Sequence, residues 1–150
     1  WKEQQEYLDK VEKDFSEIHA SVNAIRKAKK QLTSYKDYLK DQAAYKSLLE
    51  EGDKLKEKLE KWEKNIIEDR ITNGQDVINW PSKLNVEFIN LKGLLDVQDP
   101  RVTNGLKKRY SDLHASWEKE KNTFENDLKT SIKEFNQKFK EAVVPAILMD

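Results

Sequence analysis

The sequence predicts an all-α protein, an antiparallel up-down helical bundle of three long helices plus one short helix. Apolar residues recur every three to four positions along most of the chain, which is the period of a helix with one buried face. Of the 150 residues, 37% are apolar and another 37% are charged, so the apolar stripes are narrow and the remaining faces are solvated. Short connections between such helices favour antiparallel neighbours.

The first segment carries one apolar seam, in steps of three and four, which only Lys29 interrupts. This spacing is typical of the a and d positions of a heptad repeat, which face a partner helix. The seam consists of Leu8, Val11, Phe15, Ile18, Val22, Ile25 and Leu32.

The second segment repeats the pattern, with Gly52 at one seam position. A glycine inside a helix costs about 1 kcal/mol relative to alanine, and we expect a bulky neighbour to fill the space that it leaves. The other seam residues are Tyr45, Leu48, Leu55, Leu59, Trp62 and Ile66.

The boundary between these two helices is open to two interpretations. Ser34 and Asp37 have the spacing of a capping signal, but no glycine or proline forces a break. We expect a hairpin that turns within residues 33–43, because one straight helix from Gln5 to Asp69 would approach about 100 Å. The single long helix is the alternative.

After Asp69 the pattern stops, and residues 70–80 are predicted to form a loop with Asn-Gly turn chemistry. Its last residue, Trp80, either plugs the bundle end or faces a neighbouring domain. Pro81 suits the first turn of a short third helix that ends near Asp96. We expect this helix and the loop to close one end of the bundle. The seam of the short helix is Leu84, Phe88, Leu91 and Leu95.

The fourth helix is predicted to begin at a Thr103 cap and to run without interruption to Phe139. Residues 142–149 are apolar without a polar face, and Pro145 prevents a helix there. We expect this tail to dock against other residues. The fourth seam is Leu106, Tyr110, Leu113, Trp117, Phe124, Leu128, Ile132, Phe135 and Phe139.

Charge and composition argue against several classes of partner. Basic and acidic residues both number 28, so no long-range field draws the chain to nucleic acid or to an anionic membrane. No run of about 18 apolar residues predicts membrane insertion. The chain contains no cysteine, which leaves no disulfide and no thiolate chemistry.

No catalytic, cofactor-binding or metal-binding residue is predicted, and we expect that the chain is not an enzyme. A carboxylate-bridged metal bundle needs Glu-x-x-His, but His19 and His114 each follow an acid by two residues. That spacing directs the two side chains to different helix faces, so we expect ordinary interface or surface histidines. Nucleotide-binding and nucleophile motifs are absent from the sequence.

Basic clusters at residues 26–30 and 107–109 could contact phosphates, but both stand among acids. We favour solvation and helix-dipole effects for them over an anionic ligand. Trp62 and Trp117 occupy seam positions and are predicted to fill the core.

Four segments carry a family resemblance: residues 76–85 (DVINWPSKLN), 91–103, 132–136 (IKEFN) and 144–147 (VPAI). They resemble the C-terminal helical region of bacterial BNR-repeat, sortilin-like proteins, which are glycosyl hydrolase-like and carry a large β-propeller upstream. The first two helices match only as generic heptads. No propeller strand or Asp-box turn is present in the chain, so the resemblance transfers no catalytic residue.

The resemblance implies a non-catalytic accessory or interaction bundle attached to a secreted propeller, in the periplasm or outside the cell. Its partner would be the upstream β-propeller of the same chain or another copy of the parent. A free-standing spectrin-like scaffold or protein-binding module is the alternative, and the oligomeric state is open. The expected contact surface comprises Trp80, Pro81, Val143, Val144, Ile147 and Leu148.

Residues 1–150 are expected to form a single domain. The chain starts at Trp1 without a methionine and within a helical pattern. We therefore expect a fragment from the C-terminus of a larger protein, with a processed mature chain as the alternative.

Overall fold

The computed structural model describes residues 2–67, 83–97, 99 and 101–149, and every regular element among them is helical. The predicted all-α helical bundle is therefore confirmed. The elements are α1 (Lys2–Leu39), the short 3-10 helix η1 (Ala43–Tyr45), α2 (Lys46–Ile66), α4 (Leu84–Leu95), α5 (Asn104–Thr123), the π-helical turn η2 (Phe124–Leu128) and α6 (Lys129–Glu141).

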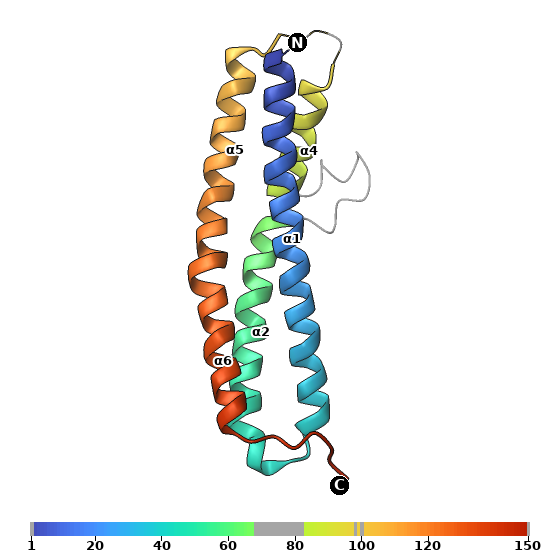
Figure 1. Cartoon of the computed structure of the whole chain (residues 1–150), viewed down its shortest axis with the longest axis vertical. Coiled ribbons are helices and arrows are strands. Elements are labelled where there is room, and N and C mark those ends of the chain that lie inside the picture. Colours follow the sequence, from blue (N-terminus) through green and yellow to red (C-terminus); the bar gives the residue numbers. More distant parts are fainter. Residues whose placement is uncertain (1, 68–82, 98, 100, 150) are drawn as a thin grey trace.

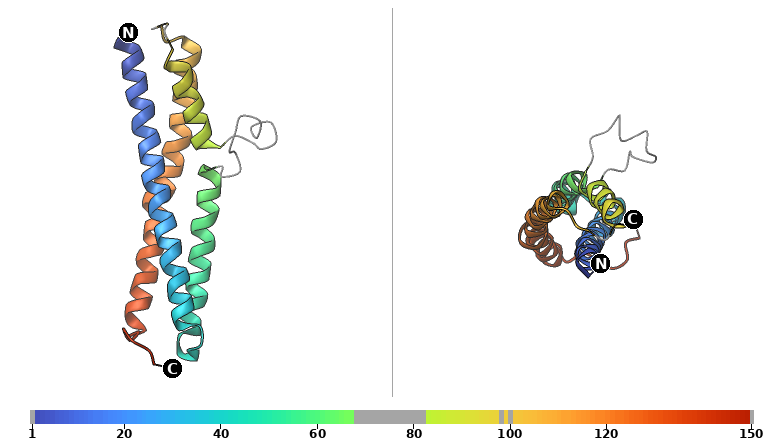
Figure 2. Two further views of the ribbon diagram at one scale, coloured as in Figure 1. Left: turned by 90° about the vertical axis from the view of Figure 1, so that its right-hand side faces the viewer. Right: turned by 90° about the horizontal axis from the view of Figure 1, so that it is seen from above.

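The helices pack lengthwise against one another and form a rod (Figure 1). α1 runs the whole length of the rod, α2 returns beside its C-terminal half, and α4 continues in line with α2 beside its N-terminal half. The third line consists of α5, η2 and α6, and runs parallel to α1. Figure 2 shows these three lines around a common axis when the rod is seen from its end.

The prediction that the short helix closes one end of the bundle is wrong. α4 packs lengthwise between α1 and α5, with all four of its predicted seam residues buried. The physical reason is length. α2 has 21 residues and α4 has 12, whereas α1 has 38, so only the two short helices placed in line cover the seam of α1.

The predicted hairpin between the first two helices is confirmed, and the single long helix is wrong. α1 continues to Leu39, and the chain turns at residues 40–42. The capping signal is not used, because the Ser34 hydroxyl lies inside α1 and donates to the Lys30 carbonyl at 3.1 Å. The bulky neighbour expected at Gly52 is Phe135, whose ring would lie 3.4 Å from a Cβ built on that glycine.

The third line contains one wide turn that the sequence pattern explains. Thr103 caps α5 as predicted, with its hydroxyl accepting from the Leu106 amide at 3.2 Å. The buried residues Phe124, Leu128 and the half-buried Ile132 follow one another in steps of four. In an α-helix each such step rotates the seam by about 40°, and the π-turn η2 compensates for that drift.

The apolar tail crosses the end of the rod beneath α1 (Figure 1). The Tyr38 hydroxyl donates to the Pro145 carbonyl at 2.6 Å, which ties the tail to α1. Val144 and Leu148 are half-buried, whereas Val143 and Ile147 are 79% and 80% exposed. The tail thus docks in part. Trp80 and Pro81, the other predicted contact residues, lie outside the described residues.

Candidate functional site

A buried acid marks the most unusual place in the core. Asp14 of α1 is only 2% exposed. It lies three residues after Val11 and four before Ile18, both fully buried, so the helical period turns its carboxylate toward the interior. A buried carboxylate is costly unless it is paired or hydrogen-bonded, and α5 supplies the partners.

Two side chains of α5 meet the same Asp14 oxygen. The Tyr110 hydroxyl donates to Asp14 Oδ2 at 3.0 Å, and His114 Nδ1 lies 2.7 Å from that oxygen. Because an ionised carboxylate only accepts, the histidine bond requires a proton on Nδ1. Tyr110 and His114 are four residues apart, and their rings stack with centroids 5.4 Å apart.

The surroundings keep the tyrosine in its donating form. Burial raises the pKa of Tyr110, and its hydrogen bond to the carboxylate of Asp14 raises the pKa further. The phenol therefore stays protonated across the physiological range. It serves as a hydrogen-bond donor to Asp14 and not as a base.

One turn further along α1, Glu17 makes a second link to α5. Its Oε2 accepts from the Trp117 indole Nε1 at 3.0 Å and from Lys121 Nζ at 3.0 Å. Burial raises the pKa of Glu17, but the bonds from Trp117 and Lys121 outweigh that effect and the net pKa is lowered. Glu17 is therefore ionised at neutral pH.

These groups surround a shallow hollow of about 320 Å³ between α1 and α5. Three lysines and three acids line it together with Tyr110 and His114, so no single sign of charge prevails. His114 Nε2 lies 3.7 Å from Glu118. The charged residues lining the hollow are Lys10, Lys13, Asp14, Glu17, Glu118 and Lys121.

The geometry favours a structural role for this cluster. The carboxylates of Asp14 and Glu17 are each hydrogen-bonded or ion-paired with two side chains of α5. Polar groups that satisfy one another at one level of a helical interface fix the register of the two helices. Within the described ranges, no three His, Asp or Glu side chains are placed to share a metal ion.

The two histidines lie in different settings. His114, predicted as an interface or surface residue, lies at the α1–α5 interface with its side chain 40% exposed. The ring of His19 lies against Phe15, with centroids 4.3 Å apart. Its Nε2 is buried and has no hydrogen-bond partner in the part of the chain that the structure describes.

The two basic clusters are largely occupied by ion pairs within the bundle. Arg26 and Lys29 approach the buried Glu63 of α2 at 3.4 and 3.2 Å. Lys29, which interrupts the first seam, thereby meets a buried acid of the facing helix. In the second cluster, Lys107 pairs with Glu3, Lys108 with Asp112 and Arg109 with Glu87.

Sequence reasoning named His114 but missed Asp14, its closest partner. The predicted seam runs through Phe15, which is half-buried, whereas the structure buries Asp14. The available signal was an acid at a heptad spacing between Val11 and Ile18, together with a tyrosine and a histidine four residues apart on another helix.

No helix in the described part of the chain is both long and apolar enough to cross a membrane. Comparison of the chain with protein-family models, with curated proteins and with solved structures found no match.

Proposed function

We propose that the chain is a non-catalytic accessory bundle, a rigid rod that separates what adjoins its two ends. The observation that carries this proposal is the position of the ends. Lys2 lies at one end of the rod and the apolar tail at the other (Figure 1). The 38 residues of α1 correspond to about 57 Å. A domain joined before Lys2 and a partner bound at the tail would be held apart by that distance.

The family resemblance gives this role a setting. In a secreted sortilin-like protein, in the periplasm or outside the cell, an upstream β-propeller would adjoin the Lys2 end. The tail would then lie about 57 Å from that junction, too far to pack on the propeller directly. Its exposed residues Val143 and Ile147 would instead contact another copy of the parent or a separate protein.

The alternative is a free-standing spectrin-like scaffold, and one observation favours it as well. A rod that the chain enters at one end and leaves at the other can be joined in series with similar rods. The coding sequence upstream of Trp1 discriminates the two proposals. Asp-box strand repeats are expected for the propeller setting, and further helical heptads for the scaffold.

The non-catalytic role is tested with the isolated chain. Because the resemblance is to glycosyl hydrolase-like proteins, the substrates are a panel of aryl glycosides at pH 5 to 8. No hydrolysis above the buffer rate is expected. Turnover by the wild type that disappears in a normally folded Asp14→Asn or His114→Gln variant would overturn the proposal, because it would make the α1–α5 cluster a catalytic site.

A further inference from the structure

The seam of α1 is packed differently in the two halves of the rod. From Val11 to Ile25 its core residues are at most 2% exposed. Further along, Ala28 and the seam residue Leu32 are only half-buried, and Tyr35 is 39% exposed. α6, which faces this part of the rod, has no fully buried residue. Residues with core spacing therefore remain accessible to solvent in the C-terminal half.

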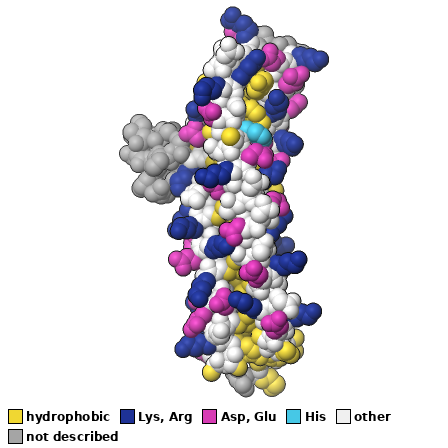
Figure 3. Space-filling model, turned by 90° about the vertical axis from the view of Figure 1, so that its left-hand side faces the viewer, with side chains coloured by type: hydrophobic (Ala, Val, Ile, Leu, Met, Phe, Trp, Pro, Cys, Tyr) yellow, Lys and Arg dark blue, Asp and Glu magenta, His cyan; other side chains and the backbone are white. Residues whose placement is uncertain are grey.

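These residues line an apolar groove between α1 and α6. The groove has a volume of about 170 Å³, and Leu55 of α2 lies at its floor. Figure 3 shows hydrophobic side chains gathered at the lower end of the neighbouring face. At that end the rings of Tyr35 and Phe139 meet with centroids 4.6 Å apart. The apolar wall residues are Ala28, Leu32 and Tyr35 of α1 with Ile132 and Phe135 of α6.

The wall residues retain a helical period. On α1 they lie at positions i, i+4 and i+7, and on α6 at i and i+3. Two such stripes side by side are the surface that a further amphipathic helix occupies in a four-helix bundle. In the N-terminal half, the corresponding stripes of α1 and α5 close on each other and on α4. In the C-terminal half, no described helix covers the stripes of α1 and α6.

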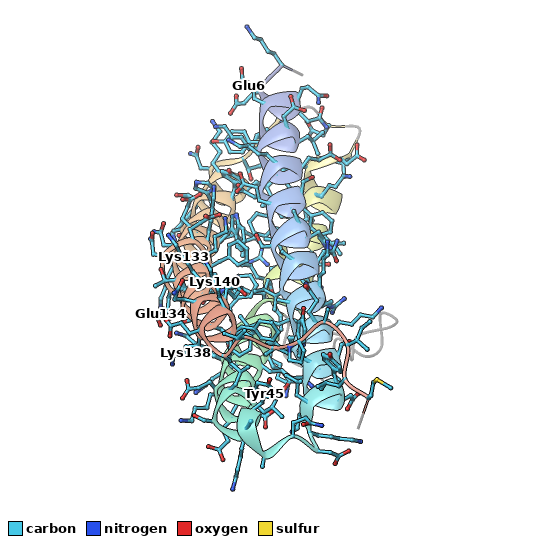
Figure 4. The ribbon with its side chains drawn as sticks, turned by 60° about the horizontal axis from the view of Figure 1, so that its bottom comes forward. Glu6, Tyr45, Lys133, Glu134, Lys138 and Lys140 are labelled. Atoms are coloured by element: carbon cyan, nitrogen blue, oxygen red, sulfur yellow. The ribbon has the colours of Figure 1, made fainter. Side chains whose placement is uncertain are left out.

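The edges of the groove are basic. Gln31 and Asn136 line its two sides. Lys27 lies four residues before Gln31, and Lys133 and Lys140 lie three before and four after Asn136, so these lysines share the groove edges. All three are exposed, and none has an ion-pair partner within the described ranges. Figure 4 labels Lys133 and Lys140 on α6.

Two lysines of the neighbouring faces are, in contrast, paired with acids of the same chain. Lys36 pairs with Asp53 at 3.0 Å and Lys138 with Glu51 at 3.1 Å across the α1–α2 and α2–α6 contacts. The three lysines at the groove edges are therefore available to acids of a partner. A partner that covers the stripes would also meet these charges.

We propose that the groove binds an amphipathic helix of a partner protein whose apolar stripe is flanked by Glu and Asp. The stripe would cover Ala28, Leu32, Ile132 and Phe135 and remove their exposed surface from water. The acidic flanks would pair with Lys27, Lys133 and Lys140. This binding goes beyond the role of the rod as a spacer, because the separation of the two ends does not depend on it.

The probes are two synthetic helical peptides of about 18 residues with the same leucine stripe in steps of three and four. One carries Glu at the flanking positions and the other Lys. Each is titrated with the 150-residue chain and followed by fluorescence anisotropy. If its Glu residues form three exposed ion pairs with the lysines at the groove edges, the acidic peptide should bind about tenfold more tightly than the basic peptide. The preference should largely vanish at about 1 M salt, where the screening length is about 3 Å.

Charge reversal on α6 provides the decisive variant. K133E/K140E should reverse the preference so that the basic peptide binds more tightly. The matched control K61E/K119E changes the net charge equally, at exposed lysines of α2 and α5 away from the groove, and should leave the preference unchanged. Circular dichroism checks that both variants keep the helical content of the wild type.

Three results would overturn the proposal. The first is equal binding of the two peptides by the wild-type chain, and the second is an unchanged preference in K133E/K140E. The third is sedimentation showing a dimer of the chain that Leu32→Glu dissociates, because the groove would then be occupied by a second copy.

Discussion

The hydrogen bond between Tyr110 and Asp14 predicts a measurable contribution to stability. Tyr110→Phe removes only the hydroxyl that donates to Asp14 Oδ2 at 3.0 Å. A hydrogen bond to a charged group contributes about 1.5–3 kcal/mol. Because Tyr110 is only half-buried and His114 still contacts the same oxygen, we expect the lower end, a loss of about 1.5 kcal/mol. Urea unfolding followed by circular dichroism at 222 nm measures the change in the free energy of unfolding.

A double-mutant cycle isolates the contact itself. In an Asp14→Ala background the hydroxyl loses the carboxylate and keeps only His114 Nδ1, at 3.3 Å. Tyr110→Phe should then change the free energy of unfolding by less than about 1 kcal/mol. Tyr7→Phe is the matched control. Tyr7 packs edge-on against Tyr110, with ring centroids 5.7 Å apart, and its hydroxyl has no hydrogen bond among the described residues. An equal effect of Tyr110→Phe in both backgrounds would refute the account of the cluster.

Three further predictions concern backbone and charge. Val143 follows α6 with φ of 50°, a left-handed conformation that a β-branched residue rarely adopts. Val143→Gly should therefore raise the free energy of unfolding, measured in urea, by about 1 kcal/mol. A decrease would argue against backbone strain at this position. Gly93 has open space where a Cβ would stand, so Gly93→Ala should stabilise the chain by about 0.5–1 kcal/mol and raise the melting temperature; a lower melting temperature would contradict this. Folding lowers the pKa of the Glu17 carboxyl. The ionised carboxylate therefore stabilises the folded chain above about pH 4.5, and this stabilisation is lost as the pH falls through the pKa of the folded state. Glu17→Gln should therefore lose less stability than the wild type between about pH 5 and pH 3, and parallel loss in both proteins would count against the assignment.

The sequence pattern predicted the helices well because each one buries a single stripe. The seams of α1, α2 and α4 identified most of the residues that the structure buries. The placement of α4 was missed for a physical reason. A stripe shows which face of a helix is buried, but not which neighbours cover it. Only the comparison of helix lengths would have placed α2 and α4 in line.

The polar cluster and the groove were harder to predict. Asp14 and Phe15 both fit the spacing of the first seam, and a preference for apolar residues selected Phe15. The structure buries Asp14 because Tyr110 and His114 on α5 satisfy its carboxylate. The groove could not be predicted because its apolar residues, such as Leu32 and Phe135, have the spacing of core residues but are only half-buried. Periodicity alone does not distinguish a filled interface from an open one.

The central claim is that the chain forms a rigid rod with its two ends far apart, and one distance tests it directly. The chain has no cysteine, so spin labels can be attached at Glu6→Cys and Lys138→Cys, two exposed positions near opposite ends (Figure 4). The length of α1 between these levels predicts one narrow distance distribution near about 45–50 Å by electron double resonance. A distribution centred below about 30 Å, or one broad enough to span both values, would contradict the account.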